Sequence, residues 1–310
     1  MTSFVELPVP LSTGQRLLTG LLRLTLKVIF RGLVRPWMPV AGQRAVLRLL
    51  ACSSRPPAQV SIEPGFLADR PCEWHRPPAP SSSVLLYLHG GAYLIGSPTT
   101  HRNLAAHLAL RCGLLVCVLD YRRAPESPYP AALDDVVAAY QALLAQGYSA
   151  SQVLIGGDSA GGHLALISAL RLPALGLPRP AALLCFSPLT DASASALHRP
   201  AAGDPVLHPS WVRQGLSAFC PPLMERQDPR LSPLNDDLTA LPPLLIQVGE
   251  DEILRDDSLR LAERVRAAGG EVRLERYPGF WHVFQSLAGR LNAADLALGR
   301  VAAFVQQRGL

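Results

Sequence analysis

Short apolar runs follow one another along the chain from residue 84 onward. The six runs cover residues 84–88, 114–119, 153–155, 181–186, 244–248 and 272–276, the last being less apolar than the others. Helical stretches lie between several of them, at residues 103–111, 131–146, 162–171 and 258–268. Strands that alternate with helices predict βαβ units, and continuous apolar strands are typical of a parallel sheet buried on both faces. The pattern therefore predicts an α/β protein that binds its ligand where the strands end.

Residues 11–50 predict one or two amphipathic helices, with Ser12 or Thr13 as the first N-cap. One apolar face of the first helix consists of Leu17, Leu21, Leu24 and Val28. We expect this face to pack against the rest of the protein; a helix lying in a membrane interface is the alternative. Three charged residues interrupt the apolar stretch at residues 17–34, so we expect no bilayer span. Because amphipathic helices of soluble proteins usually bury their apolar face internally, we also expect no membrane contact.

Two other segments are rich in turn-forming residues. Residues 51–80 contain many prolines, with an edge strand expected near residues 59–62. Residues 189–240 separate two strand runs by a distance that is too long for a simple loop. A connection of that length predicts a lid or a binding segment.

The chemistry is concentrated at the predicted strand ends. Gly157-Asp158-Ser159-Ala160-Gly161 fits the G-x-S-x-G pattern, and it follows a strand run and opens a helical stretch. In such a turn the serine hydroxyl enters the cleft, and the next N–H, here that of Ala160, points at a developing oxyanion. A phosphate-binding loop would need a G-K-[ST] ending, which is missing here.

His89-Gly90-Gly91 directly follows the apolar run 84–88. Glycines allow backbone N–H groups to approach a tetrahedral oxyanion closely. Beside a nucleophilic serine, this segment predicts an oxyanion hole.

Chain order selects the remaining members of a triad. In this architecture an acid and then a histidine follow the serine. His282 lies after the last strand run and a Tyr-Pro-Gly turn, whereas the other late histidines fall in the 189–240 insertion. The acid should follow run 244–248, where Glu250, Asp251 and Glu252 are all chemically suitable.

These residues resemble the hormone-sensitive-lipase-like branch of the α/β-hydrolases, the bacterial family IV carboxylesterases. The matching segments lie within residues 84–286: His89-Gly90-Gly91-Ala92-Tyr93, Asp120-Tyr121-Arg122-Arg123-Ala124-Pro125-Glu126, Tyr129-Pro130-Ala131-Ala132, Gly157-Asp158-Ser159-Ala160-Gly161-Gly162, Asp251-Glu252-Ile253-Leu254-Arg255-Asp256 and Gly279-Phe280-Trp281-His282. The resemblance favours Asp251 as the acid. It places the oxyanion hole at Gly90, Gly91, Ala92 and Ala160.

The resemblance also implies an architecture and an activity. The fold would be a mostly parallel eight-stranded sheet flanked by helices, with a mainly helical cap. Residues 1–50 and 189–240 would form the cap, and residues 51–188 and 241–310 the catalytic domain. The substrate would be a small-molecule ester of a short or medium acyl chain. Family members are often dimers through the last strand or helix, so the resemblance allows a homodimer but leaves the oligomeric state open.

Two positions depart from the family pattern. Ala92 replaces the third glycine of the usual His-Gly-Gly-Gly, and its methyl group is expected to limit bulky alcohol groups. Arg123 replaces a leucine in a segment that we expect to support the site structurally, as we expect of Glu126.

Composition excludes several other classes. The net charge is +5, but no basic run is interleaved with aromatic residues, so we expect no nucleic-acid partner. The six cysteines and eight histidines show no zinc-ligand spacing, and we expect neither a metal nor a cofactor. Their spacing and the absence of a signal-like N-terminus favour a reduced, cytoplasmic protein.

Three other functions remain open for this sequence. They are a lipase for long acyl chains, an amidase with the same triad, and a ligand-binding homologue without catalysis.

Overall fold

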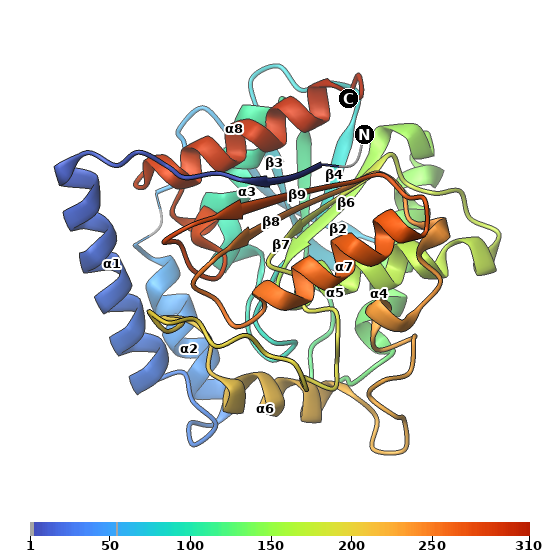
Figure 1. Ribbon diagram of the computed structural model, residues 1–310. Helices are drawn as coiled ribbons and strands as arrows, with labels where there is room; N and C mark the ends of the chain where they lie inside the picture. Colours follow the sequence, from blue (N-terminus) through green and yellow to red (C-terminus); the bar gives the residue numbers. More distant parts are fainter. Residues whose placement is uncertain (1–2, 54) are drawn as a thin grey trace.

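The structure, a computed structural model, describes residues 3–53 and 55–310. Within these residues, nine strands form one sheet with the order β1-β9-β8-β7-β6-β4-β5-β3-β2 (Figure 1). The strands are β1 (Ser3–Glu6), β2 (Ser61–Leu67), β3 (Arg70–Arg76), β4 (Val84–Leu88), β5 (Leu115–Leu119), β6 (Val153–Asp158), β7 (Ala182–Phe186), β8 (Leu244–Gly249) and β9 (Val272–Tyr277). All neighbours pair in parallel except β2 with β3 and β3 with β5.

Helices cover both faces of the sheet (Figure 1). They are α1 (Thr13–Gly32), α2 (Val40–Ala51), α3 (Pro98–Cys112), α4 (Ala131–Ala145), α5 (Ala160–Arg171), α6 (Pro209–Phe219), α7 (Arg255–Ala267) and α8 (Asn292–Gln306). Apolar side chains of α3 and α8 pack on one face, and those of α4, α5 and α7 on the other. Every residue of β4 is therefore buried, as its continuous apolar sequence predicts.

All six predicted strand runs and the four predicted helical stretches are confirmed, and Ser12 caps α1. The sheet has nine strands where eight were predicted, and β1, β3, α6 and α8 were not identified in the sequence. Strand β1 has four residues and belongs to the sheet, although the sequence placed residues 1–50 in the cap. It pairs with β9, so β1 and not β9 forms this edge of the sheet.

The orientation of α1 differs from the prediction. Leu22 and Leu26 pack inward, whereas Leu17, Leu21 and Leu24 are more than half exposed, as is Val28. The face that we expected to be buried is thus the outer face. Helices α1, α2 and α6 lie together at one side of the molecule (Figure 1), and side chains from all three line one cavity.

Candidate active site

Ser159 occupies a sharp turn between β6 and α5. Its backbone has φ 55° and ψ −118°, a conformation that L-amino acids rarely adopt. Its N–H donates to the carbonyl oxygen of Phe186 on β7 at 2.8 Å, which anchors the turn. A Cβ on Gly161 would lie 1.9 Å from the carbonyl oxygen of Leu88, so the turn requires glycine there. This close approach explains why the G-x-S-x-G pattern has glycine at this position.

His282 lies on the loop after β9 and is held by a carboxylate. Its Nδ1 lies 3.1 Å from Oε1 of Glu252, which follows β8. Glu252 is fully buried, and its Oε2 accepts hydrogen bonds from Ser187 Oγ at 2.7 Å and from the Gly249 N–H at 2.9 Å. These bonds fix the carboxylate, which in turn fixes the imidazole and leaves Nε2 as the free ring nitrogen.

The choice of Asp251 as the acid is corrected by this geometry. Asp251 turns the other way from Glu252 and accepts a hydrogen bond from Arg23 Nη1 on α1 at 2.8 Å. The Arg23 guanidinium also lies over the Trp281 ring, 6.0 Å from its centroid. Asp251 therefore attaches α1 to the acid turn, which is the turn after β8 that contains Glu250, Asp251 and Glu252. Glu252, one of the three carboxylates that the sequence left open, occupies the position beside the histidine.

The loop after β4 brings backbone N–H groups close to Ser159. Gly91 has φ 120° and Ala92 has φ 52°, so the loop turns sharply inward. In the described part of the chain, no acceptor is paired with the N–H groups of Gly91, Ala92 or Ala160. Ala160 begins α5, and the first N–H groups of a helix lack partners within that helix. The three N–H groups are therefore free to donate to a ligand, and the oxyanion hole at these residues stays a prediction.

Gly90 is a second correction. Its N–H donates to Asp158 Oδ1 at 3.1 Å, with His101 Nε2 also close at 3.3 Å, so it cannot serve an oxyanion. A Cβ at Gly90 would lie 2.1 Å from Asp158 Oδ2. The sequence marked this glycine correctly as a position of close approach, but the approaching group is a carboxylate of the protein.

Asp158 forms a buried polar cluster that the sequence did not reveal. It accepts from Tyr87 Oη at 2.8 Å and lies 3.3 Å from His101. Burial alone would raise the pKa of Asp158, but the charge of His101 and the hydrogen bonds from His101 and Tyr87 outweigh burial and lower the pKa. The charged carboxylate of Asp158 thus holds the loop after β4 by accepting the N–H of Gly90. The signal in the sequence was Asp158 itself, inside the serine motif.

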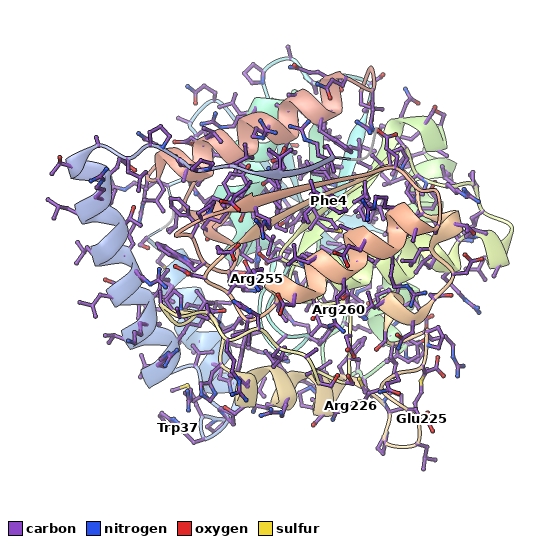
Figure 2. All side chains as sticks on the ribbon, viewed as in Figure 1. Phe4, Trp37, Glu225, Arg226, Arg255 and Arg260 are labelled. Carbon is purple, nitrogen blue, oxygen red and sulfur yellow. The ribbon has the colours of Figure 1, made fainter. Side chains whose placement is uncertain are left out.

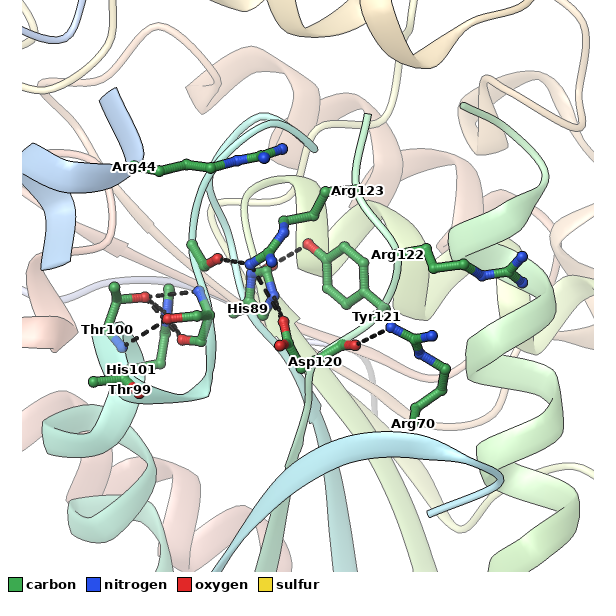
Figure 3. Close-up of polar contacts among 12 residues, drawn as sticks. Arg44, Arg70, His89, Thr99, Thr100, His101, Asp120, Tyr121, Arg122 and Arg123 are labelled. Atoms are coloured by element: carbon green, nitrogen blue, oxygen red, sulfur yellow. Dashed lines mark hydrogen bonds and ion pairs between the residues drawn. The ribbon is translucent and has the colours of Figure 1, made fainter. Parts of the chain in front are cut away.

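The segment that follows β5 supports the same loop from outside (Figure 3). Tyr121 stacks on the His89 ring at 4.2 Å and donates its hydroxyl to the His89 carbonyl oxygen at 2.6 Å. Arg123 forms an ion pair with Asp120 at 3.2 Å and donates to the carbonyl oxygen of Gly96. Arg123 therefore joins the segment after β5 to the loop after β4, which agrees with the structural role expected for it.

Helix α2 is joined to the same segment by Arg44. It forms an ion pair with Glu126 at 2.6 Å and donates to the carbonyl oxygens of Leu94 and Ala124. The hydrogen bond from Arg44 lowers the pKa of Glu126 to about 2, so this carboxylate stays charged. Glu126 braces the site, as expected. His163 packs against Tyr93 and Phe219 and also has a structural position.

Two cavities meet at Ser159. The larger has a volume of ≈ 330 Å³ and is bounded by Ser159, His282, Gly91 and apolar side chains of α1, α2 and α6. The smaller has a volume of ≈ 20 Å³, and Ala92 and Ala160 border it beside Ser159. The walls of the small cavity are otherwise formed by Tyr93, Leu189, Leu207, Trp211, Val212, Leu216 and Leu254. His282 borders the large cavity only.

The described residues contain no group of three or more histidine, cysteine or acidic side chains arranged to hold a metal ion. They also contain no helix that is long and apolar enough to cross a bilayer.

Comparison with known proteins gives a consistent result. Residues 85–286 match the family of the α/β-hydrolase fold. An acetyl-hydrolase of Streptomyces hygroscopicus is 43% identical over 213 residues, which are 68% of this chain and 71% of that protein. An esterase of Acinetobacter venetianus is 38% identical over 79% of this chain and 82% of its own.

A solved esterase of the bacterial hormone-sensitive lipase family shares 35% identity and superposes with a TM-score of 0.87, covering 97% of this chain and 99% of its own. The fold and the resemblance expected from the sequence are both confirmed. The chain therefore belongs to the α/β-hydrolase family and, within it, to the hormone-sensitive-lipase-like branch.

Proposed function

We propose that this protein is a serine carboxylesterase that acts through an acyl-enzyme intermediate. Ser159 attacks the ester carbonyl, His282 accepts its proton, and Glu252 orients the imidazole and stabilises its charged form. The observation that carries the proposal is that Ser159, in a strained turn, shares a cavity with a histidine bonded to a buried carboxylate. Esterases and an acetyl-hydrolase among its relatives support this chemistry.

The oxyanion would be stabilised by the backbone N–H groups of Gly91, Ala92 and Ala160. Preorganised donors in a site closed to water contribute strongly to acyl transfer, because they need no reorganisation as charge develops. Ala92 keeps the N–H that the usual glycine would supply. Its methyl group lies against α6, since a Cβ on Gly215 would come within 2.8 Å of the Ala92 Cβ.

The acyl and alcohol parts of the substrate are placed in different cavities. His282 must return its proton to the leaving alcohol, so the alcohol has to lie on the side of His282, in the large cavity. The acyl chain then points into the small cavity beside Ala92 and Ala160. A space of ≈ 20 Å³ is close to that of one water molecule and accepts only a short chain without rearrangement. We therefore propose short acyl esters of larger, apolar alcohols as substrates.

Residues 1–50 and 189–240 are proposed to act as the cap over this site, on the catalytic residues 51–188 and 241–310. Both cap segments contribute to the wall of the large cavity, with Leu22 and Leu47 from one and Trp211 from the other. Strand β1 at the start of the first segment belongs to the sheet instead. Because all six cysteines are free thiols, we also propose a reducing, cytoplasmic compartment.

A matrix of esters tests this proposal. One series keeps p-nitrophenol and lengthens the acyl chain from acetate to palmitate, and the other keeps acetate and lengthens the alcohol. We expect kcat/KM to fall beyond short acyl chains and to rise with the apolar area of the alcohol. The opposite pattern, or hydrolysis of a p-nitroanilide instead of the esters, would contradict the proposed specificity or the proposed reaction respectively.

Leu216 on α6 lines the small cavity but not the large one. Leu216→Ala is expected to raise kcat/KM for the hexanoyl ester relative to the acetyl ester by about tenfold, the value of one or two methylene groups in an apolar pocket. Ester competition measures the ratio directly, so loss of stability from the buried site does not affect it. Leu287→Ala, which changes only the large cavity, is the control and should leave the acyl ratio unchanged.

The pH dependence should carry the signature of His282. Burial alone would lower the pKa of His282, but the adjacent Glu252 outweighs it and, with Asp204 and Asp158, raises the pKa. The base works only when neutral, so kcat/KM should fall as pH decreases through a value above the ordinary imidazole pKa of about 6.5. Glu252→Gln removes the charge and should move this acid limb to lower pH. A limb that stays in place would exclude Glu252 as the partner.

A further inference from the structure

The exposed apolar residues of this protein are concentrated on its N-terminal helices. Seven of the twelve large apolar side chains that the described chain leaves exposed lie within residues 17–49. They are Leu17, Leu21, Leu24, Val28, Leu33, Trp37 and Leu49. Leu17 is 72% exposed and Leu49 is 74% exposed, and Trp37 projects outward at the turn between α1 and α2 (Figure 2). We call these seven residues the outer apolar stripe.

The charge of the same segment is uniformly positive. Residues 7–62 contain eight cationic residues and no acidic residue. The cations are Arg16, Arg23, Lys27, Arg31, Arg35, Arg44, Arg48 and Arg55. The whole chain has 29 basic and 24 acidic residues, so acidic residues outnumber basic ones outside this segment. The positive net charge of the protein therefore comes from the part that carries the outer apolar stripe.

Internal contacts neutralise only part of this charge. Arg23 is paired with Asp251, and Arg44 with Glu126. Arg16, Lys27 and Arg48 are exposed and have no ion-pair partner in the part of the chain that the structure describes. Within α1 the apolar residues recur at intervals of three and four, so they form one face, and Arg16 and Lys27 adjoin it in sequence.

From this combination we infer that α1 and α2 bind the surface of an anionic lipid bilayer, with the outer apolar stripe among the acyl chains and the flanking cations at the head groups. Helices with leucine and tryptophan on one face and arginine or lysine beside it lie in the interface in this way. Anionic head groups supply the opposite charge. The helix would lie on the membrane, because α1 is not apolar enough to span it.

The charge also argues against a second copy of the chain as the occupant. A two-fold dimer brings the same patch of both subunits together, so it would oppose like charges across the interface. A bilayer has no such cost. Binding to a bilayer also explains why the apolar residues of α1 are aliphatic and form a continuous face. A single-stranded nucleic acid would need aromatic residues on which its bases stack.

The arrangement would bring the active site close to a source of apolar substrate. The inner face of α1 borders the large cavity with Leu22, Leu26 and Phe30. The outer face of the same helix carries Leu21 and Leu24. Helix α1 alone thus separates the bound lipid from the space where we place the apolar alcohol. The placement of the alcohol rests on the proposed function, whereas the inference of membrane binding does not.

Vesicle sedimentation with the full chain tests the inference. The protein is mixed with vesicles of phosphatidylcholine alone, or of phosphatidylcholine with an equal part of phosphatidylglycerol. We expect binding to the anionic vesicles only, and at least tenfold weaker partition in Leu17→Ser/Leu21→Ser/Leu24→Ser. Phe66→Ser/Leu175→Ser/Leu223→Ser removes three exposed apolar residues elsewhere and should bind like the parent. Arg16→Gln/Lys27→Gln/Arg48→Gln should lose the preference for anionic vesicles.

Hydrolysis of soluble p-nitrophenyl acetate reports the fold of each variant separately, since none of these residues borders the active-site cavities. All three variants should keep this activity within about twofold, the small effect expected of exposed positions. Absence of vesicle binding by the parent would overturn the inference, as would equal binding by the stripe variant or equal loss in its control. A dimer in sedimentation equilibrium that the stripe variant dissociates, without vesicle binding, would assign the stripe to self-association instead.

Discussion

Ser159→Ala is expected to lower kcat/KM for p-nitrophenyl acetate by about a thousandfold or more, because triad members act as a unit and their loss removes the covalent route. The substitution removes one oxygen from a side chain that is 8% exposed, so the fold and the cavities should persist. Steady-state kinetics on protein with an unchanged thermal transition measures the effect.

The residual rate is informative as well. The N–H groups of Gly91, Ala92 and Ala160 remain in the variant, so some acceleration over water should survive. Ser187→Ala is the matched control, because Ser187 is buried nearby but bonds to Glu252 instead of substrate. Its loss should be far smaller. Near-normal turnover in Ser159→Ala would show that another group is the nucleophile.

The kcat values of Glu252→Ala and Asp251→Ala should differ by about three orders of magnitude, although the two residues are neighbours. Glu252 holds His282 at 3.1 Å, and removal of the acid from a triad costs about 10⁴ in kcat. Asp251 holds Arg23, so its loss weakens the attachment of α1 but leaves the imidazole oriented. We expect less than about a tenfold effect, since a partly exposed ion pair contributes little.

Glu252→Asp provides a further check on the same assignment. The shorter side chain keeps the charge and should restore part of the activity that alanine removes. If Asp251→Ala proved the more damaging substitution, the acid would have to be reassigned to Asp251 and the turn between β8 and α7 would adopt another path during catalysis.

The contrast between these neighbours shows where sequence reasoning succeeds. The placement of Ser159 and His282 at one cavity was predictable from local pattern and chain order, as were the strands that end beside them. The carboxylate that lies beside His282 was not predictable, because Glu250, Asp251 and Glu252 are chemically alike and the path of one turn decides which of them faces inward. Arg23, the partner that fixes Asp251, lies 228 residues away along the chain.

Non-local contacts also account for the other differences. The N–H of Gly90 donates to Asp158, which lies at the end of β6 and 68 residues away along the chain. Strand β1 is too short and too mixed in polarity to stand out, and only its pairing with β9 defines it. The face of α1 that is buried could not be chosen from periodicity, because Leu22 and Leu26 form an apolar row as regular as the exposed one.

The contacts around Asp204 have a consequence for how this enzyme class diversifies. Asp204 belongs to the 189–240 insertion, yet its Oδ2 accepts the N–H of Ile253 beside Glu252, and its carbonyl oxygen accepts a bond from Arg31 on α1. Arg23 reaches the neighbouring Gly203 as well. The two cap segments and the acid turn are thus one hydrogen-bonded unit. A chimera that exchanged the insertion alone would lose its hydrogen bonds to α1 and to the acid turn. The sequences of the three segments are therefore expected to change together among related enzymes, as a single inherited module.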